Sequence, residues 1–387
     1  MRGSTTAPGR SERIIADICG SNAGTCLVAF GGIHGNEHGG VTALERVAAH
    51  LGSLGAKGSA CPANGRILAL RGNIAALEQG VRFVDRDLNR GWSLDTADAL
   101  RRGEGSTVED CEARDLLTIL DGTLATWPGP VVFLDLHSTS GQGRPFVCIP
   151  DTVENLRIAL DLPVPSILGI EETVAGPLVG LMSDLGCAGL IVEGGQHDDP
   201  GTAACLESAV WVLLVALGLV RQKHAPDYGA HWNRLAAAGS GLPRVLEIVA
   251  LHETRPNDGF QMLRRMNHYE HVLRGQVVAR DHHGDVVARK SGRIVMPAYL
   301  PGTDQGFFIA RDVPAIFVWI LLALRYLRLD RACPRLPGAH RHADNRDLLD
   351  VSNWVPRRMV DIIRLLGWRR LAHEGDHTVL RRRRVRR

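Results

Sequence analysis

The stretch that decides the fold is TCLVAFGGIHGNEHGG, residues 25–40. Its first part, Thr25–Phe30, is an apolar run with the length and composition of a buried strand. A glycine-rich turn follows, and the next residues predict a helix from about His38 to Leu51. A buried strand that leads through such a turn into a helix is typical of an α/β sheet with helices on both faces.

The alternation of strands and helices continues to about residue 219. Strands are predicted at Arg66–Arg71, Val131–Leu136, Ser166–Ile170 and Leu190–Glu193, and helices at Pro177–Leu185 and Thr202–Leu219. Ser106 and Glu109 have the spacing of a capping box, which predicts a further helix that runs to about Trp127. We therefore expect one large α/β domain, residues 1–240.

The pattern changes after a loose stretch at Gln222–Pro243. Short strand-like runs separated by turn signals predict a small β-rich domain over residues 241–312. An extension, residues 313–387, follows. It begins with an apolar helix and continues through a loop rich in Pro, His and Arg to a second helix near Val355–Leu366 and an Arg-rich end. The sequence indicates no role for this extension.

The composition excludes several classes of protein. A net charge of +3 over 387 residues creates no basic field, so we expect no nucleic-acid partner. The longest apolar run, Val313–Leu324, is about half as long as a membrane span, and Met1–Arg13 lack the apolar core of a signal peptide. The eight cysteines include no Cys-x-x-Cys pair. We expect a cytoplasmic protein without a membrane partner. The sequence leaves open whether the chain forms a homo-oligomer.

Three side chains at predicted strand ends have the chemistry of a metal site. His34 and Glu37 are three residues apart, so on a helix-like turn they share one face. His137 directly follows the strand Val131–Leu136. Reactive groups in parallel α/β sheets collect at the carboxyl ends of strands. Two imidazoles and one carboxylate suit zinc and leave a fourth position for water, which is the layout of a catalytic zinc site.

Glu193 lies at the end of a third apolar strand and precedes two glycines. A surface charge is a poor explanation for a carboxylate in this position. A base beside a zinc-activated water explains it better, because a positioned carboxylate can move the proton of that water.

A charged loop completes the set of candidates. Arg82 and Arg90 frame it, and the planar guanidinium of arginine binds carboxylates through two hydrogen bonds. These side chains could hold an acidic substrate or a polarised carbonyl, whereas in isolation the loop would be a solvated surface.

Taken together, the motifs resemble the succinylglutamate desuccinylase/aspartoacylase family of the zinc carboxypeptidase-like superfamily. The motifs are His34-x-x-Glu37, Arg82, Asp85-x-Asp87-Leu88-Asn89-Arg90, Asp135-Leu136-His137-Ser138 and Glu193-Gly194-Gly195-Gln196. The β-rich stretch up to about Asp312 also resembles the C-terminal domain of that family. The resemblance implies a zinc carboxypeptidase-like mixed sheet flanked by helices, with the smaller β-rich domain and a partly helical extension behind it.

The resemblance also implies a role for each matching residue. His34, Glu37 and His137 would hold the zinc ion, and Glu193 would activate the water. Arg82 would steady the carbonyl oxygen of the scissile bond. Asn89 and Arg90 would bind the carboxylate of the amino-acid product, and Asp135 would orient a zinc ligand.

Two departures from the family pattern concern the substrate. Aspartoacylase-like members carry an arginine about ten residues before the catalytic glutamate, where it reads the acyl carboxylate, but Ser183 and Asp184 occupy that region here. A substrate-contacting tyrosine of the β-rich domain is replaced near Met296-Pro297, with Tyr299 close by. We therefore do not expect N-acetylaspartate or succinylglutamate as the substrate.

The sequence predicts a zinc-dependent amidohydrolase that removes an acyl group from an N-acylated amino acid or a similar small amine. One alternative is a metallocarboxypeptidase-like enzyme that acts on short peptides. Another is a non-catalytic metal-binding protein whose extension docks a partner. An intact Glu193 argues against the second alternative, because a structural zinc site has no use for a base.

Overall fold

The structure is a computed structural model. It describes residues 10–20, 22–56, 63–170, 173–174, 176–255, 257–263, 266–299, 305–343, 345 and 347–382. Its α-helices are α1 Arg10–Arg13, α2 His38–Ala56, α3 Ile74–Gln79, α4 Leu94–Arg101, α5 Val108–Thr126, α6 Val153–Leu160, α7 Leu178–Asp184, α8 Pro200–Ala216, α9 Tyr228–Gly239, α10 Ala315–Tyr326 and α11 Arg357–Leu365.

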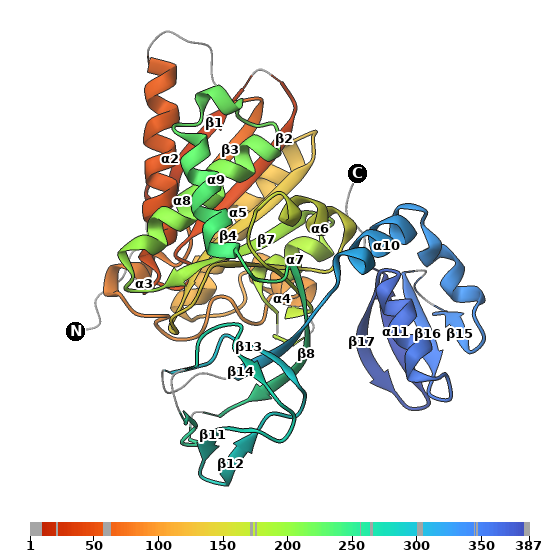
Figure 1. Cartoon of the computed structure of the whole chain (residues 1–387). Coiled ribbons are helices and arrows are strands. Elements are labelled where there is room, and N and C mark those ends of the chain that lie inside the picture. The colour runs from red at the N-terminus through yellow and green to blue at the C-terminus, as the bar shows by residue number, and fades with distance from the viewer. Residues whose placement is uncertain are drawn as a thin grey trace.

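One mixed sheet of eleven strands organises the molecule, in the order β1-β3-β2-β4-β7-β5-β6-β8-β14-β13-β10. The strands are β1 Ile14–Cys19, β2 Thr25–Gly31, β3 Gly65–Arg71, β4 Val131–Thr139, β5 Phe146–Ile149, β6 Ser166–Leu168, β7 Ala188–Gln196, β8 Val245–Glu253, β10 His271–Val272, β13 Gly292–Val295 and β14 Gln305–Asp312. The predicted α/β class is confirmed, and helices cover both faces of the sheet (Figure 1).

Strand β2 shows why the opening stretch is apolar at every position. Leu27 and Ala29 pack in one core with α2 and α8, and Val28 and Phe30 pack in the opposite core with α5. All four are fully buried. A central parallel strand has no face in water, so its side chains form a continuous apolar run rather than an alternating one.

Part of the β-rich region continues this sheet, and the rest forms a small sheet of its own. β8 pairs in parallel with β6, and β14 pairs antiparallel with β8. A second sheet, in the order β12-β11-β9, projects from this end and consists of β9 Gln261–Met262, β11 Val277–Asp281 and β12 Gly284–Val287 (Figure 1). Backbone hydrogen bonding therefore runs across the predicted boundary at residue 240.

The extension contains more strand than its sequence indicated. After α10 and a 3-10 helix, Leu329–Arg335, it forms a four-stranded sheet in the order β15-β16-β18-β17. These strands are β15 Ala339–Arg341, β16 Leu348–Ser352, β17 Trp368–Glu374 and β18 His377–Arg382. Leu349, Trp368 and Leu380 form the centre of their small core. Figure 1 shows this unit beside the large domain, below α10.

Parallel pairing brings three strand ends together. β2 pairs with β4, and β4 pairs with β7, so that Gly31 lies beside Leu136 and His137 lies beside Glu193. The segments that follow these strands therefore meet at one edge of the sheet.

Candidate active site

The turn that carries the first two candidate ligands depends on glycine. Gly32 has a φ of +74°, a conformation that side-chain-bearing residues rarely adopt. A Cβ atom on Gly35 would lie 2.1 Å from the backbone carbon of Ala76, so α3 can approach only because Gly35 has no side chain. The Glu37 amide donates to the His34 carbonyl at 3.1 Å, which closes the turn.

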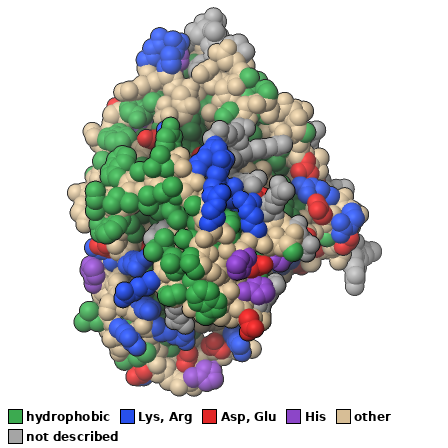
Figure 2. Space-filling view, turned by 90° about the vertical axis from the view of Figure 1, so that its right-hand side faces the viewer, with side chains coloured by type: hydrophobic (Ala, Val, Ile, Leu, Met, Phe, Trp, Pro, Cys, Tyr) green, Lys and Arg blue, Asp and Glu red, His purple; other side chains and the backbone are tan. Residues whose placement is uncertain are grey.

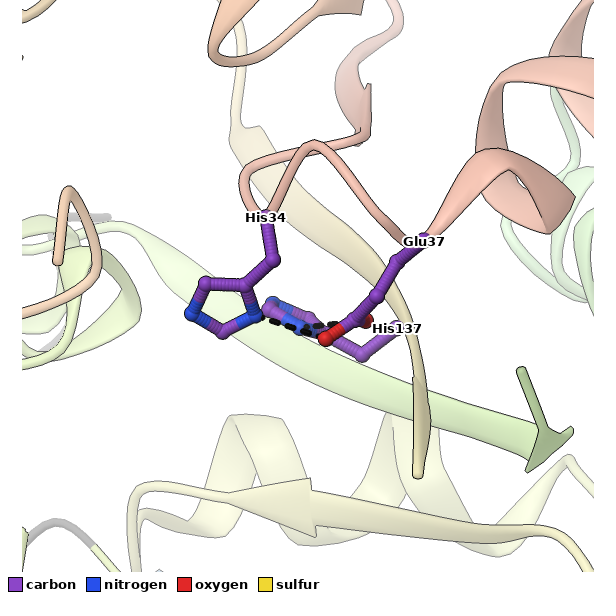
Figure 3. A group of neighbouring side chains, drawn as sticks. All are labelled: His34, Glu37 and His137. Atoms are coloured by element: carbon purple, nitrogen blue, oxygen red, sulfur yellow. Dashed lines mark hydrogen bonds and ion pairs between the residues drawn. The ribbon is translucent and has the colours of Figure 1, made fainter. Parts of the chain in front are cut away.

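His34, Glu37 and His137 point toward one another (Figure 3). His34 Nδ1 lies 2.7 Å from one carboxylate oxygen of Glu37, and His137 Nδ1 lies 3.2 Å from the other. One ligand atom from each residue lies within 4.8 Å of the others, and all three side chains are buried. This grouping was predicted from three separate positions in the sequence, and the residues could hold one metal ion.

The donor set and its electrostatics fit a divalent cation. Burial alone would raise the pKa of Glu37, but the charges of His34 and His137 outweigh it and hold the pKa well below its usual range. Burial alone would lower the pKa of His137, but Asp135 and Glu37 raise it well above its usual value. The acids thus stabilise positive charge at this point, which a metal ion could supply in place of protons.

Each histidine also has an outer carboxylate. His34 Nε2 lies 3.1 Å from Asp87 Oδ1, and His137 Nε2 lies 2.9 Å from Asp135 Oδ2. An acid in this position sets the ring orientation and raises the basicity of a metal-binding histidine. Asp135 was expected to act in this way. Asp87 was not, although the sequence motif had singled it out without a role.

Glu193 is buried and faces the same side of the sheet as His137. The two residues are register neighbours on adjacent parallel strands. One carboxylate oxygen of Glu193, Oε2, is buried without a hydrogen-bond partner among the described residues. Burial raises the pKa of Glu193 to about 8, and the neighbouring charges of His137, Glu37, Asp135 and Arg82 modify this effect. A carboxyl with a raised pKa beside a candidate metal site is typical of a general base.

The catalytic candidate Arg82 and the substrate-binding candidates Asn89 and Arg90 gather around Asp87. Arg82 donates to Asp87 Oδ2 at 3.1 and 2.9 Å and lies 3.7 Å from Glu37. Arg90 donates to the Asn89 carbonyl at 2.9 Å and lies 4.0 Å from Asp87. The amide group of Asn89 spans the site, since Oδ1 accepts from the Leu178 amide at 2.9 Å and Nδ2 lies 3.5 Å from His137 Nε2.

Glu109 shapes the loop that carries these side chains, a role the sequence analysis missed. This buried carboxylate accepts from the backbone amides of Val84, Asp85 and Arg86 at 2.7 to 3.1 Å, and from Asn73 at 3.1 Å.

The predicted capping box was wrong by one residue. Thr107 and Asp110 cap α5 reciprocally instead of Ser106 and Glu109. The shift frees Glu109 from the cap, so that it can hold the loop. The spacing could not distinguish the two, because both pairs match the capping pattern.

Two further contacts tighten the site around β4. The Ser138 amide donates to Glu37 Oε2 at 2.7 Å, and Ser138 Oγ lies 2.8 Å from His197 Nδ1. Burial lowers the pKa of His197, and the nearby charges of Glu37, Arg82 and His34 also affect it. His197 therefore lies near the candidate metal site, whereas His38, which adjoins Glu37 in sequence, is exposed.

The positions where the sequence departs from the family pattern do not supply a substitute reader. Ser183 and Asp184 end α7, ahead of the amino end of β7, whereas Glu193 lies toward its carboxyl end. Asp184 forms an ion pair with Arg381 at 3.4 Å. The hydroxyl of Tyr299 donates to the Met266 carbonyl at 2.7 Å and accepts from the Met266 amide at 2.6 Å, so it fastens a loop.

Comparison with known proteins agrees with this arrangement. Residues 23–162 match the family model described as the succinylglutamate desuccinylase/aspartoacylase catalytic domain. The large domain therefore contains a region similar to the catalytic domain of that family. The matched stretch includes His34, Glu37 and His137, while Glu193 lies beyond it.

The chain is similar to curated and solved relatives over different lengths. It is 32% identical over 130 residues to succinylglutamate desuccinylase from Pseudomonas paraeruginosa (strain DSM 24068 / PA7), which covers 34% of this chain and 36% of the relative. The match thus spans about a third of that relative's length.

The solved structures show the shared fold. A succinylglutamate desuccinylase/aspartoacylase from Rhodobacter sphaeroides matches with a TM-score of 0.53 and 16% identity, over 77% of this chain and 88% of the other. Succinylglutamate desuccinylase from Vibrio cholerae matches with a TM-score of 0.53 and 17% identity, over 76% and 83%. At these identities the comparison concerns the fold alone.

Proposed function

We propose that this protein is a zinc-dependent amidohydrolase that removes an acyl group from an N-acylated amino acid or a similar small amine. The observation that carries the proposal is Glu193. Its buried carboxyl, with one unpartnered oxygen, lies beside a strand that ends in a candidate metal ligand. A non-catalytic metal site would gain nothing from a desolvated acid in this place.

His34, Glu37 and His137 would hold the zinc ion, since nitrogen and oxygen donors in this number leave a coordination position for substrate or water. A bound zinc ion supplies Lewis acidity, which polarises a carbonyl and acidifies water. Asp87 and Asp135 would keep the two imidazole rings in the orientation that binding requires.

Glu193 would move the proton during hydrolysis. As a carboxylate it takes a proton from the attacking water, and as a carboxylic acid it returns that proton to the leaving amine nitrogen. A raised pKa makes the carboxylate a stronger base toward water, and the neutral acid then holds the proton until the amine nitrogen takes it.

Arg82 and Arg90 would bind the polar ends of the substrate. The Arg82 side chain is 36% exposed and lies near Glu37, so it can stabilise negative charge on the carbonyl oxygen. Arg90 and Asn89 would bind the carboxylate of the amino-acid product through charge-assisted hydrogen bonds. The identity of the acyl group is left open, because Asp184 pairs with Arg381 and no arginine occupies the position at which the family binds the acyl carboxylate.

The free thiols support a cytoplasmic setting. Among the cysteines that the structure describes, Cys19, Cys26, Cys111, Cys205 and Cys333 are free thiols. Unpaired cysteines in this number are typical of a reducing compartment. We propose the cytoplasm on this ground.

The deciding experiment is Glu193→Gln with zinc content measured beside turnover. We expect the variant to retain zinc and to lose at least about a hundredfold in turnover on the best substrate from a panel of N-acyl amino acids. His137→Ala is the matched control and should lose the metal as well. Near-normal turnover by Glu193→Gln would refute the proposed role.

The same panel tests the alternatives when short peptides are added to it. If C-terminal residues are released from peptides faster than acyl groups are released from N-acyl amino acids, a carboxypeptidase-like function would be favoured. No turnover by the zinc-loaded wild-type chain on any compound would favour a metal-binding protein without catalysis.

A further inference from the structure

Helix α10 of the extension presents large apolar side chains to solvent. The exposed residues are Ile316 at 62%, Phe317 at 59%, Trp319 at 66%, Ile320 at 44%, Tyr326 at 79% and Leu327, just past the helix, at 66%. We call these six residues the α10 patch. Figure 2 views the side of the molecule that carries the extension, and hydrophobic side chains form a broad area there.

The patch is one of two apolar faces of the same helix. Val318, Leu321 and Arg325 face the large domain, and Arg325 binds Asp151 at 2.6 and 2.8 Å. Ile316, Trp319, Ile320 and Leu327 follow the spacing of a single stripe on the other side. A helix that is apolar all round is normally buried all round. One face of α10 is therefore covered by its own chain, and no residue that the structure describes covers the other.

The area of the patch suits a stable protein interface. Large side chains carry roughly 150–250 Å² each, so the exposed parts of these six offer on the order of 600–900 Å². A standard interface buries about 800 Å² on each partner. Isolated surface residues would not add up to such a contiguous patch.

A groove runs beside the patch and continues it. Its lining includes Trp319, Leu322 and Tyr326 with Leu160 and Leu217 of the large domain, and also charged side chains such as Glu154, Arg157 and Arg331. Its volume of about 1700 Å³ exceeds what small-molecule pockets of roughly 300–1,000 Å³ provide. A protein segment with bulky side chains fits such a groove better than a metabolite does.

We propose that the α10 patch is the interface of a homodimer, in which α10 packs against α10 of a second copy. Arg325 is the only ionisable group with full charge among the twelve residues of the helix, and Asp151 neutralises it. An uncharged apolar face matches its own copy across a two-fold axis without like-charge repulsion. Apolar cores of this kind also distinguish homodimer interfaces from transient ones.

The test is the mass of the full chain in solution, measured by sedimentation velocity over a range of concentrations. The wild type should sediment as a particle of twice the 42.0 kDa chain mass. Trp319→Glu should weaken the dimer at least about thirtyfold, because it places a charge at the centre of the interface. Circular dichroism and thermal unfolding check that the variant is folded.

A matched pair of leucines controls for exposure and charge. Leu327→Glu changes a patch residue that is 66% exposed, whereas Leu273→Glu changes a leucine of the β-rich region that is 69% exposed. Only the first should favour the monomer. A wild type that stays monomeric at every concentration would overturn the proposal. This holds even if the monomer then binds lipid vesicles or another protein. Equal dimerisation of all four proteins would overturn it as well.

Discussion

Glu37 links the two histidines of the site, and each histidine uses its second nitrogen for an outer acid. The contact between His34 and Glu37 is local in sequence, whereas the contact between His34 and its outer acid joins distant segments. His34 and Glu37 share a turn, while Asp87 reaches His34 from a loop 53 residues away. The site is therefore organised by carboxylates that belong to different segments of the chain.

Asp87 should contribute to metal affinity through His34. Asp87→Asn removes the charge that orients the ring, so zinc affinity should fall about 10- to 100-fold. Competition with a chelator of known affinity measures the change. Asp85→Asn is the control, because Asp85 accepts from the Val108 amide at 2.8 Å and belongs to the same loop. Unchanged zinc affinity in Asp87→Asn would show that Asp87 does not orient His34.

Glu193 should make the stability of the metal-free protein depend on pH. Its pKa is raised from 4.5 to about 8 by burial, so the folded chain retains a proton that the unfolded chain has released across this window. The free energy of unfolding therefore falls as the pH rises from about 4.5 to about 8. Glutamine has no group that titrates here, so the free energy of unfolding of Glu193→Gln does not fall in this way. Relative to the wild type it should increase by roughly 3–5 kcal/mol as the pH rises across the window.

Urea unfolding of chelator-treated protein at several pH values measures this difference. Glu104→Gln changes an exposed carboxyl and should follow the wild type at every pH. Parallel curves for wild type and Glu193→Gln would contradict the raised pKa.

At the scale of elements, the amino end of α5 supports the loop that carries Arg82, Asp87 and Arg90. The helix begins at a cap formed by Thr107 and Asp110, and the neighbouring Glu109 is buried in the protein. Three consecutive backbone amides of the loop donate to this one carboxylate. The amino end of a helix thus positions the loop of the candidate site without contributing a proposed catalytic group.

Glu109→Gln should destabilise this arrangement. The new amide group places a donor where backbone N–H groups need an acceptor, and the free energy of unfolding should fall by roughly 2–3 kcal/mol. Denaturant unfolding measures the loss, and hydrogen exchange should show faster exchange at residues 84–86. Glu104→Gln, on the exposed segment before α5, should cost less than about 0.5 kcal/mol. Equal stability of the two variants would argue against the anchoring role.

At the scale of the whole molecule, the extension is attached through α10. Arg325 is buried and binds both carboxylate oxygens of Asp151, which belongs to the loop before α6. Val318 and Leu321 join the main core from the same face of the helix. No described helix of the chain is long and apolar enough to cross a membrane, and α10 has only twelve residues.

Arg325→Met should loosen the extension. It keeps most of the side-chain volume but leaves Asp151 without its charge partner, at a cost of about 3 kcal/mol. Limited proteolysis should then cleave near residues 312–330 sooner than in the wild type, while the large domain stays resistant. Arg331→Met, an exposed position beyond α10, is the control. Identical cleavage of all three proteins would show that the ion pair does not fasten the helix.

Much of the large domain was predictable because its signals are local. The strands β2, β3, β4 and β7 and the helices α2 and α8 follow from apolar runs, glycines and periodicity over a few residues. The four strands of the extension were missed, since β17 and β18 carry arginines at several positions and resemble a solvated tail. β17 and β18 pair with each other as a local hairpin across Gly375-Asp376, but β18 also pairs with β16, which lies in a separate part of the sequence.

The sequence by itself determined the α/β class, the three candidate ligands and the candidate base, because ligand chemistry and strand ends are properties of short segments. Only the tertiary structure decided which acid lies beside which histidine, that Glu109 holds a loop instead of capping a helix, and that the described residues leave one face of α10 exposed. These depend on contacts between distant segments, and periodicity along a chain does not specify which surface the folded protein leaves in solvent.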